Sequence, residues 1–178
     1  MKQILIVIDM QNDFITGALG SEQAKAIVPK AAQKVHDFQG EVIFTRDTHE
    51  PDYLSTQEGR LLPVEHCVRG SEGWQICPEI AASRDLLFCR IFDKGTFGSK
   101  ELAQMLSAEA ESIEKITLVG LCTDICVISN AMLLKAFLPE VPIAVDASCC
   151  AGVTEKSHRT ALDAMRACQI ETIGYKGE

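Results

Sequence analysis

The sequence has no excess of positive charge and no long apolar run. It contains 17 Lys and Arg against 25 Asp and Glu, which gives a net charge of −8 at pH 7. Proteins that bind nucleic-acid phosphates or anionic membranes cluster Lys and Arg, so neither partner is expected here. The apolar runs are shorter than the roughly 18 residues of a membrane span, and the first, residues 4–8, is too short for a signal peptide. We therefore expect a cytoplasmic protein.

The eight cysteines include no C-x-x-C pair. This absence argues against a zinc ribbon, and a reducing compartment argues against a disulfide scaffold. In such a compartment most cysteines are small, buried, inert side chains. At most one of these thiols is therefore expected to be chemically special.

Short apolar runs alternate with helical patterns along the 178 residues. Runs that are apolar almost throughout are typical of strands buried on both faces of a parallel sheet. Six occur, at residues 3–8, 41–45, 86–91, 116–120, 142–146 and, more weakly, 171–173. Helical patterns cover residues 29–38, with Pro29 in the first turn, and residues 99–106, 124–137 and 154–168. This order predicts one domain, residues 1–178, built as a three-layer α/β/α sandwich with a mostly parallel, Rossmann-like six-stranded sheet.

Polar side chains follow the first two predicted strands. Asp9 ends the first, where a turn or helix-cap carboxylate is an equally good interpretation. Asp47 and His49 end the second, and residues two apart in extended chain face the same side. Glu58 and His66 come from the long irregular segment that follows, and the four together suit a divalent transition metal. A buried, hydrogen-bonded His66 without a metal is the alternative.

A cysteine follows the fourth predicted strand. Gly120 permits a tight turn, Thr123 suits a helix N-cap, and Cys126 then falls in the first helical turn. Free N–H groups and the helix dipole at that place should lower the pKa of the thiol and hold an oxyanion. Cys122 precedes the helix, so the helix dipole should affect its thiol less. For both cysteines the alternative is a buried, chemically inert side chain. Lys94, after the third strand, is by itself an ordinary loop lysine.

Five motifs occur in order along the chain. They are Asp9-x-Gln11-x-Asp13-Phe14, Asp47-x-His49, Pro63-x-x-His66-Cys67-Val68-x-Gly70, Lys94-x-x-Phe97 and Gly120-x-x-Thr123-Asp124-x-Cys126-Val127. Together they resemble the isochorismatase-like cysteine hydrolase superfamily, and within it the nicotinamidases, also called pyrazinamidases. The resemblance covers the whole chain.

The resemblance implies a catalytic triad. Asp9 would be the general base, Cys126 the nucleophile, and Lys94 the cation that holds the carboxylate and the thiolate in register. It also implies a cis peptide bond between Leu121 and Cys122, which would turn the N–H of Cys122 toward that of Cys126 and so form the oxyanion hole.

The resemblance also implies a metal ion and a substrate. A divalent ion, preferably zinc, with manganese or iron as alternatives, would be held by Asp47, His49, Glu58 and His66. Some branches of the superfamily carry a third histidine in place of the glutamate. The implied reaction is hydrolysis of nicotinamide to nicotinic acid and ammonia, a step of NAD salvage.

The ring of the substrate would pack against apolar side chains near the site. Phe14, Leu19 and Phe97 are the candidates, and each also suits an ordinary core position. Thr48 stands where the family often has an aromatic residue, and Cys122 where it usually has a small one. A homo-oligomer is common in the superfamily, but no residue pattern here fixes the number of subunits.

Two alternatives to a nicotinamidase remain open. The first is a cysteine hydrolase of another small amide or carbamoyl compound, although relatives of that kind commonly lack the metal set. The second is a non-catalytic metal-binding or redox-sensing module. A structural zinc site in such a module would be closed by four protein ligands, for which Cys67 and Cys77 lie near His66 in the sequence.

Overall fold

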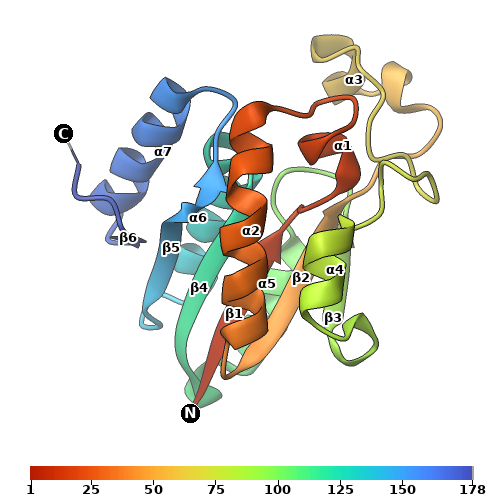
Figure 1. Cartoon of the computed structure of the whole chain (residues 1–178). Helices are drawn as coiled ribbons and strands as arrows, with labels where there is room; N and C mark the ends of the chain where they lie inside the picture. Colours follow the sequence, from red (N-terminus) through yellow and green to blue (C-terminus); the bar gives the residue numbers. More distant parts are fainter. Residues whose placement is uncertain (178) are drawn as a thin grey trace.

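The computed structural model describes residues 1–177 and has a six-stranded, wholly parallel sheet at its centre (Figure 1). The strands are β1 (Lys2–Ile8), β2 (Glu41–Asp47), β3 (Arg90–Lys94), β4 (Ile113–Leu121), β5 (Ile143–Ala151) and β6 (Glu171–Ile173). Their spatial order is β3-β2-β1-β4-β5-β6, so the direction of winding reverses between β1 and β4. Ligands bind beyond the carboxyl ends of the strands at such a reversal.

Helices cover both faces of this sheet (Figure 1). The long ones are α2 (Glu22–Asp37), α5 (Lys100–Ala108), α6 (Ile128–Phe137) and α7 (Glu155–Ala167), and the short ones are α1 (Asn12–Ile15), α3 (Gln57–Leu61) and α4 (Pro78–Ser83). Single turns lie at η1 (Tyr53–Ser55), η2 (Leu86–Phe88), η3 (Ala110–Ser112) and η4 (Thr123–Val127). The predicted three-layer α/β/α sandwich is confirmed. Across residues 1–177, every helix is too short or too polar to cross a membrane.

The central strand β1 supplies both hydrophobic cores. Its residues 4–8 are fully buried, and their side chains alternate between the two faces of the sheet. Ile4, Ile6 and Ile8 pack with apolar residues of α5, α6 and α7. Leu5 and Val7 pack with those of α1, α2 and α4. Burial on both faces explains why β1 is apolar throughout.

The third strand lies later in the chain than predicted. Residues 86–88 form the exposed turn η2, in which Asp85 Oδ1 accepts the Leu87 N–H, and the side chains of Leu87 and Phe88 are about nine-tenths exposed. The strand itself, β3, pairs with β2 in a register that sets Asp47 opposite Lys94. Lys94 is therefore the last residue of an edge strand rather than a residue of the following loop.

Two helix boundaries also differ from the prediction. α2 begins at Glu22 because Ser21 Oγ accepts the Ala24 N–H at 3.0 Å, and Pro29 consequently lies inside the helix rather than in its first turn. The predicted helix over residues 124–137 begins with the π-helical turn η4 and becomes α-helical at Ile128.

Candidate active site and metal centre

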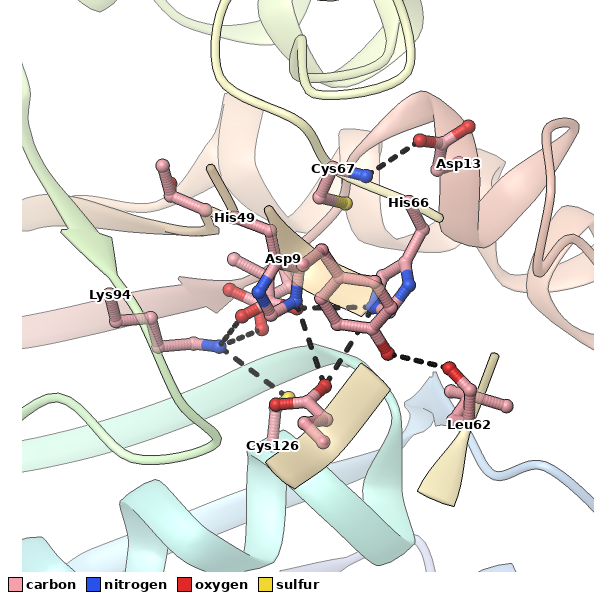
Figure 2. Close-up of polar contacts among 12 residues, drawn as sticks. Asp9, Asp13, His49, Leu62, His66, Cys67, Lys94 and Cys126 are labelled. Carbon is pink, nitrogen blue, oxygen red and sulfur yellow. Dashed lines mark hydrogen bonds and ion pairs between the residues drawn. The ribbon is translucent and has the colours of Figure 1, made fainter. Parts of the chain in front are cut away.

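Asp9, Lys94 and Cys126 lie together at the carboxyl ends of β1, β3 and β4. Lys94 Nζ is 2.6 Å from Asp9 Oδ2 and 3.5 Å from Cys126 Sγ (Figure 2). All three side chains are buried, and Asp9 is fully so. Thr45 Oγ1 donates a hydrogen bond to the second oxygen of Asp9, Oδ1, at 2.6 Å. A buried ammonium ion therefore links a carboxylate to a thiol.

A glycine allows the first and fourth strands to end this close together. Gly120 has φ +120°, and a Cβ atom there would overlap the carbonyl oxygen of Ile8, the residue before Asp9. The chain then passes through a cis peptide bond between Leu121 and Cys122, as expected from the sequence, and enters η4.

Burial and charge shift the titration of the three groups. Burial raises the pKa of Asp9, and the Lys94 ammonium only partly offsets this. Burial opposes a charged Lys94, but Asp9, Cys126 and Asp47 outweigh it and raise the pKa of the amine, so Lys94 remains an ammonium ion. Burial and the Asp9 carboxylate together raise the pKa of the Cys126 thiol well above its usual range.

The expected lowering of the Cys126 pKa is therefore wrong. The sequence placed this thiol in the first turn of an α-helix, whereas it is 4 % exposed, lies in the π-helical turn η4, and is close enough to the Asp9 carboxylate to feel its charge. Burial in an apolar core disfavours the thiolate. The resting cysteine is thus a thiol that needs a base, and Asp9, which contacts the same Lys94 ammonium group, is the candidate for it.

Asp47, His49, Glu58 and His66 converge beside this triad. One donor atom from each lies within 4.8 Å of all the others. His49 Nε2 is 3.1 Å from Asp47 Oδ2 and 3.6 Å from Glu58 Oε1, and the corresponding distances from His66 Nε2 are 3.6 and 3.9 Å. Donors bound tetrahedrally at about 2.0–2.1 Å from zinc lie roughly 3.3 Å apart, so the four atoms fit one divalent ion.

The charges of this cluster also suit a cation. Burial raises the pKa of Glu58, and the neighbouring Asp47 carboxylate raises it further. Burial likewise disfavours the charged form of Asp47, but hydrogen bonds from His49 and His66 outweigh it and lower the pKa of that carboxyl. Lys94 Nζ, 3.2 Å from Asp47 Oδ1, joins the cluster to the triad.

Surrounding groups orient the two imidazole rings. His66 Nδ1 donates to the Val64 carbonyl at 2.8 Å, which leaves Nε2 as the atom that faces the cluster. The fully buried Tyr53 ring packs against both histidines, with its centroid 4.5 Å from that of His49 and 5.0 Å from that of His66. The Tyr53 hydroxyl donates to the Leu62 carbonyl at 2.9 Å.

Gln11 and Asp13 hold the backbone of the two segments that carry the cluster. Gln11 Oε1 accepts the Asp47 N–H at 2.7 Å, and Gln11 Nε2 donates to the Asp47 carbonyl at 2.8 Å and to that of Trp74 at 2.9 Å. Asp13 Oδ2 accepts the Cys67 N–H at 2.7 Å (Figure 2). The sequence drew attention to both residues through their motif but assigned them no role.

The remaining predicted residues are less closely tied to the site. Phe14 lies edge-on to His66, with centroids 5.5 Å apart. Leu19 packs against the core shared by α1 and α2, and Phe97 is 41 % exposed. Within residues 1–177, the four-residue metal cluster includes neither Cys67 nor Cys77.

Two features of Cys122 bear on its role. Burial and the nearby Asp124 raise the pKa of its thiol to about 12, so Cys122 stays protonated at neutral pH. It also lies in the turn before η4, and its sulfur has no contact with Lys94 among those found for the described residues.

Known proteins share both the sequence pattern and the fold. The family model described as Isochorismatase domain matches residues 3–175. The nicotinamidase of Saccharomyces cerevisiae is 25 % identical over 171 residues, covering 72 % of this chain and 79 % of the yeast protein.

Solved structures of nicotinamidases and pyrazinamidases share the fold of this chain. The nicotinamidase/pyrazinamidase of Bacillus subtilis superposes with a TM-score of 0.85 at 26 % identity over 97 % of this chain and 100 % of the other. The pyrazinamidase of Pyrococcus horikoshii in complex with zinc has a TM-score of 0.82 at 23 % identity over 98 % and 100 %. The chain therefore belongs to the isochorismatase domain family, and its relatives there are nicotinamidase-like hydrolases that act on amide C–N bonds.

Proposed function

We propose that this protein is a metal-dependent cysteine amidohydrolase that converts nicotinamide and water to nicotinic acid and ammonia. The observation that carries the proposal is Lys94, whose buried ammonium group contacts Asp9, Cys126 and the metal-cluster residue Asp47. A nucleophile and a cluster of metal ligands are thereby fixed side by side, as hydrolysis of a ring-bearing amide requires. The nicotinamidases among the relatives support nicotinamide as the substrate.

In the first half of the reaction, Asp9 takes the proton of the Cys126 thiol as the sulfur attacks the amide carbon. A C–S bond forms, and the electron pair of the carbonyl π bond moves to oxygen. The backbone N–H groups of Cys122 and Cys126 are the proposed oxyanion hole. The oxyanion then collapses, the C–N bond breaks, and Asp9 returns its proton to the leaving nitrogen to give ammonia.

In the second half, Asp9 accepts a proton from water, which attacks the thioester carbon. The C–S bond breaks, nicotinic acid leaves, and the proton on Asp9 restores the Cys126 thiol. The raised pKa of Asp9 suits both halves, because a more basic carboxylate is a better proton acceptor near neutral pH. Lys94 keeps its charge throughout and offsets the negative charge on Asp9 and on the sulfur.

Asp47, His49, Glu58 and His66 are the proposed metal ligands. These four residues would hold a divalent ion, zinc by preference, which would act as a Lewis acid beside the triad and would bind the ring nitrogen of the substrate by expanding its coordination beyond the four protein donors. Phe14, next to His66, is the proposed side chain against which the ring packs, with Leu19 and Phe97 as further candidates. The product would enter pyridine nucleotide synthesis in the cytoplasm.

Ammonia release from nicotinamide tests the proposal. The purified protein loaded with zinc should turn over nicotinamide, and Cys126→Ala and a chelated sample should not. Cys168→Ala, which removes an exposed thiol away from the site, is the matched control and should retain activity. No turnover by the metal-loaded wild type would refute nicotinamide as the substrate. Turnover of N-carbamoyl compounds in its place would identify the other amidase, and turnover of neither would leave a non-catalytic module.

A further inference from the structure

Asn130 lies one helical turn after the proposed nucleophile, on α6, and is 1 % exposed. Its side-chain nitrogen donates to the carbonyl oxygens of Cys126 at 2.8 Å and Phe97 at 2.9 Å. Its side-chain oxygen accepts the Ser99 N–H at 3.0 Å. Both donors and the acceptor of this amide thus bind backbone groups, and they join the turn of Cys126 to the loop between β3 and α5.

A second contact holds the same loop against α6. A Cβ atom at Gly98 would lie 3.4 Å from Leu133 Cδ2 and 3.6 Å from the Ser129 carbonyl oxygen, so the backbone of the loop lies against the helix beside the Asn130 bonds. The loop begins directly after Lys94 and contains Phe97, whose carbonyl is held by the Asn130 amide while the residue as a whole is 41 % exposed.

The residue type fits this bridging role. Asparagine is unfavourable inside a helix because its side chain competes for backbone hydrogen bonds. A serine or threonine at this position would satisfy the carbonyl four residues earlier, that of Cys126. Only a longer side chain with two donors and an acceptor also reaches Phe97 and Ser99.

We propose that Asn130 is a positioning residue that fixes the Phe97 backbone relative to Cys126. A substrate whose aromatic ring packs on Phe97 then presents its carboxamide carbon to the thiol. Asn130 therefore favours aromatic carboxamides over reagents that have no ring. This inference rests on the proposed function, because it requires a ring-bearing amide at the triad.

Asn130→Thr separates the bond to the Cys126 carbonyl from the two bonds to the loop. The threonine hydroxyl keeps the bond to the Cys126 carbonyl and loses both bonds to the loop. We expect kcat/KM for nicotinamide to fall about 10- to 100-fold, as for a displacement of reacting groups by about 1 Å. The rate at which iodoacetamide, which has no ring, alkylates Cys126 should stay at the wild-type value, as read by peptide mass spectrometry.

Two controls distinguish positioning from general destabilisation. Ser21→Ala removes the helix cap of α2 far from the site and should lower the melting temperature without changing kcat/KM, measured where every variant is folded by circular dichroism. In a Phe97→Ala background, Asn130→Thr should have little further effect, because Asn130 acts through Phe97.

Three outcomes would overturn the inference: wild-type kcat/KM in Asn130→Thr, a parallel loss of alkylation at Cys126, or additive losses in the double variant. Absence of nicotinamide turnover by the wild type refutes the proposed function, and this inference with it. Wild-type turnover that Asn130→Thr retains refutes this inference alone.

Discussion

Replacing Lys94 with methionine tests whether one buried ammonium ion holds the two negatively charged parts of the site together. Methionine keeps most of the side-chain length and removes the charge. Lys94 Nζ lies 2.6 Å from Asp9 and 3.2 Å from Asp47. At an effective dielectric constant of about 20, these distances correspond to roughly 6 and 5 kcal/mol of attraction before the cost of desolvation.

The net effect is smaller because desolvation of the ions offsets much of this attraction. Removing one partner of a buried ion pair typically costs about 3–5 kcal/mol, since the remaining charge stays buried without compensation. Lys94→Met should therefore lower the free energy of unfolding by about 3–5 kcal/mol. Urea unfolding at pH 7 in the presence of a chelator measures this quantity without a contribution from metal.

Lys34→Met is the matched control. Lys34 Nζ is also 2.6 Å from its partner, Asp146, but the Lys34 side chain is 27 % exposed whereas that of Lys94 is 1 % exposed. A pair in which the cation is partly open to water is worth less than a fully buried one, about 1 kcal/mol, because water solvates the ammonium group. Equal losses in the two variants, or a loss below about 1 kcal/mol for Lys94→Met, would refute the view that burial makes the Lys94 charge essential.

Three further perturbations follow from the same contacts. Burial alone would raise the pKa of Asp146, but hydrogen bonds from Lys34 and Ser148 outweigh it and lower the pKa below the ordinary value of 3.8. The stability that Lys34→Met removes is therefore present at neutral pH and is lost as the pH falls below 3.8, so the difference between the two proteins in urea unfolding should shrink there, and an undiminished difference would contradict the assignment. Gln11→Leu removes the two hydrogen bonds from the Gln11 side chain to the Asp47 backbone and should weaken zinc binding about 10- to 100-fold in competition with a chromophoric chelator. Unchanged affinity would show that these bonds do not orient the Asp47 ligand. Cys122→Ala should retain nicotinamide turnover, because among the contacts found for the described residues Lys94 reaches the sulfur of Cys126 and not that of Cys122; loss of turnover would move the reaction to the Cys122 sulfur.

The central strands could be predicted from the sequence because strands buried on both faces are apolar throughout. β1 is covered on both faces, so its residues 4–8 are all apolar. The edge strand β3 is not covered on both faces, and Lys94 is the one buried residue among its five. The strongest apolar run nearby belongs instead to Leu87 and Phe88 in an exposed turn, which is why the third strand was predicted too early.

The site could be predicted where its residues follow strands directly. Asp9 and Asp47 end their strands, and parallel strands end at a common edge. Tyr53 has no comparable feature in the sequence, because its contacts with His49 and His66 depend on how the irregular segment folds back. Thr45 could have been found, since it lies two residues before Asp47 on an extended strand and therefore on the same face.

The protonation state of Cys126 could not be predicted from local sequence. The start of a helix favours a thiolate, and that effect is visible in the sequence. Complete burial and the opposing Asp9 carboxylate depend on tertiary structure, and they act in the other direction. The resulting account requires proton transfer from Cys126 to Asp9 during the reaction.

The central claim is that Cys126 forms a covalent thioester with the substrate. Rapid acid quenching of the zinc-loaded enzyme during turnover of nicotinamide, followed by peptide mass spectrometry, tests this claim most directly. The account predicts a nicotinoyl adduct on the peptide that contains Cys126, and its absence from Cys126→Ala. Turnover with no adduct at Cys126 at any quench time, or with the adduct on another cysteine, would contradict it.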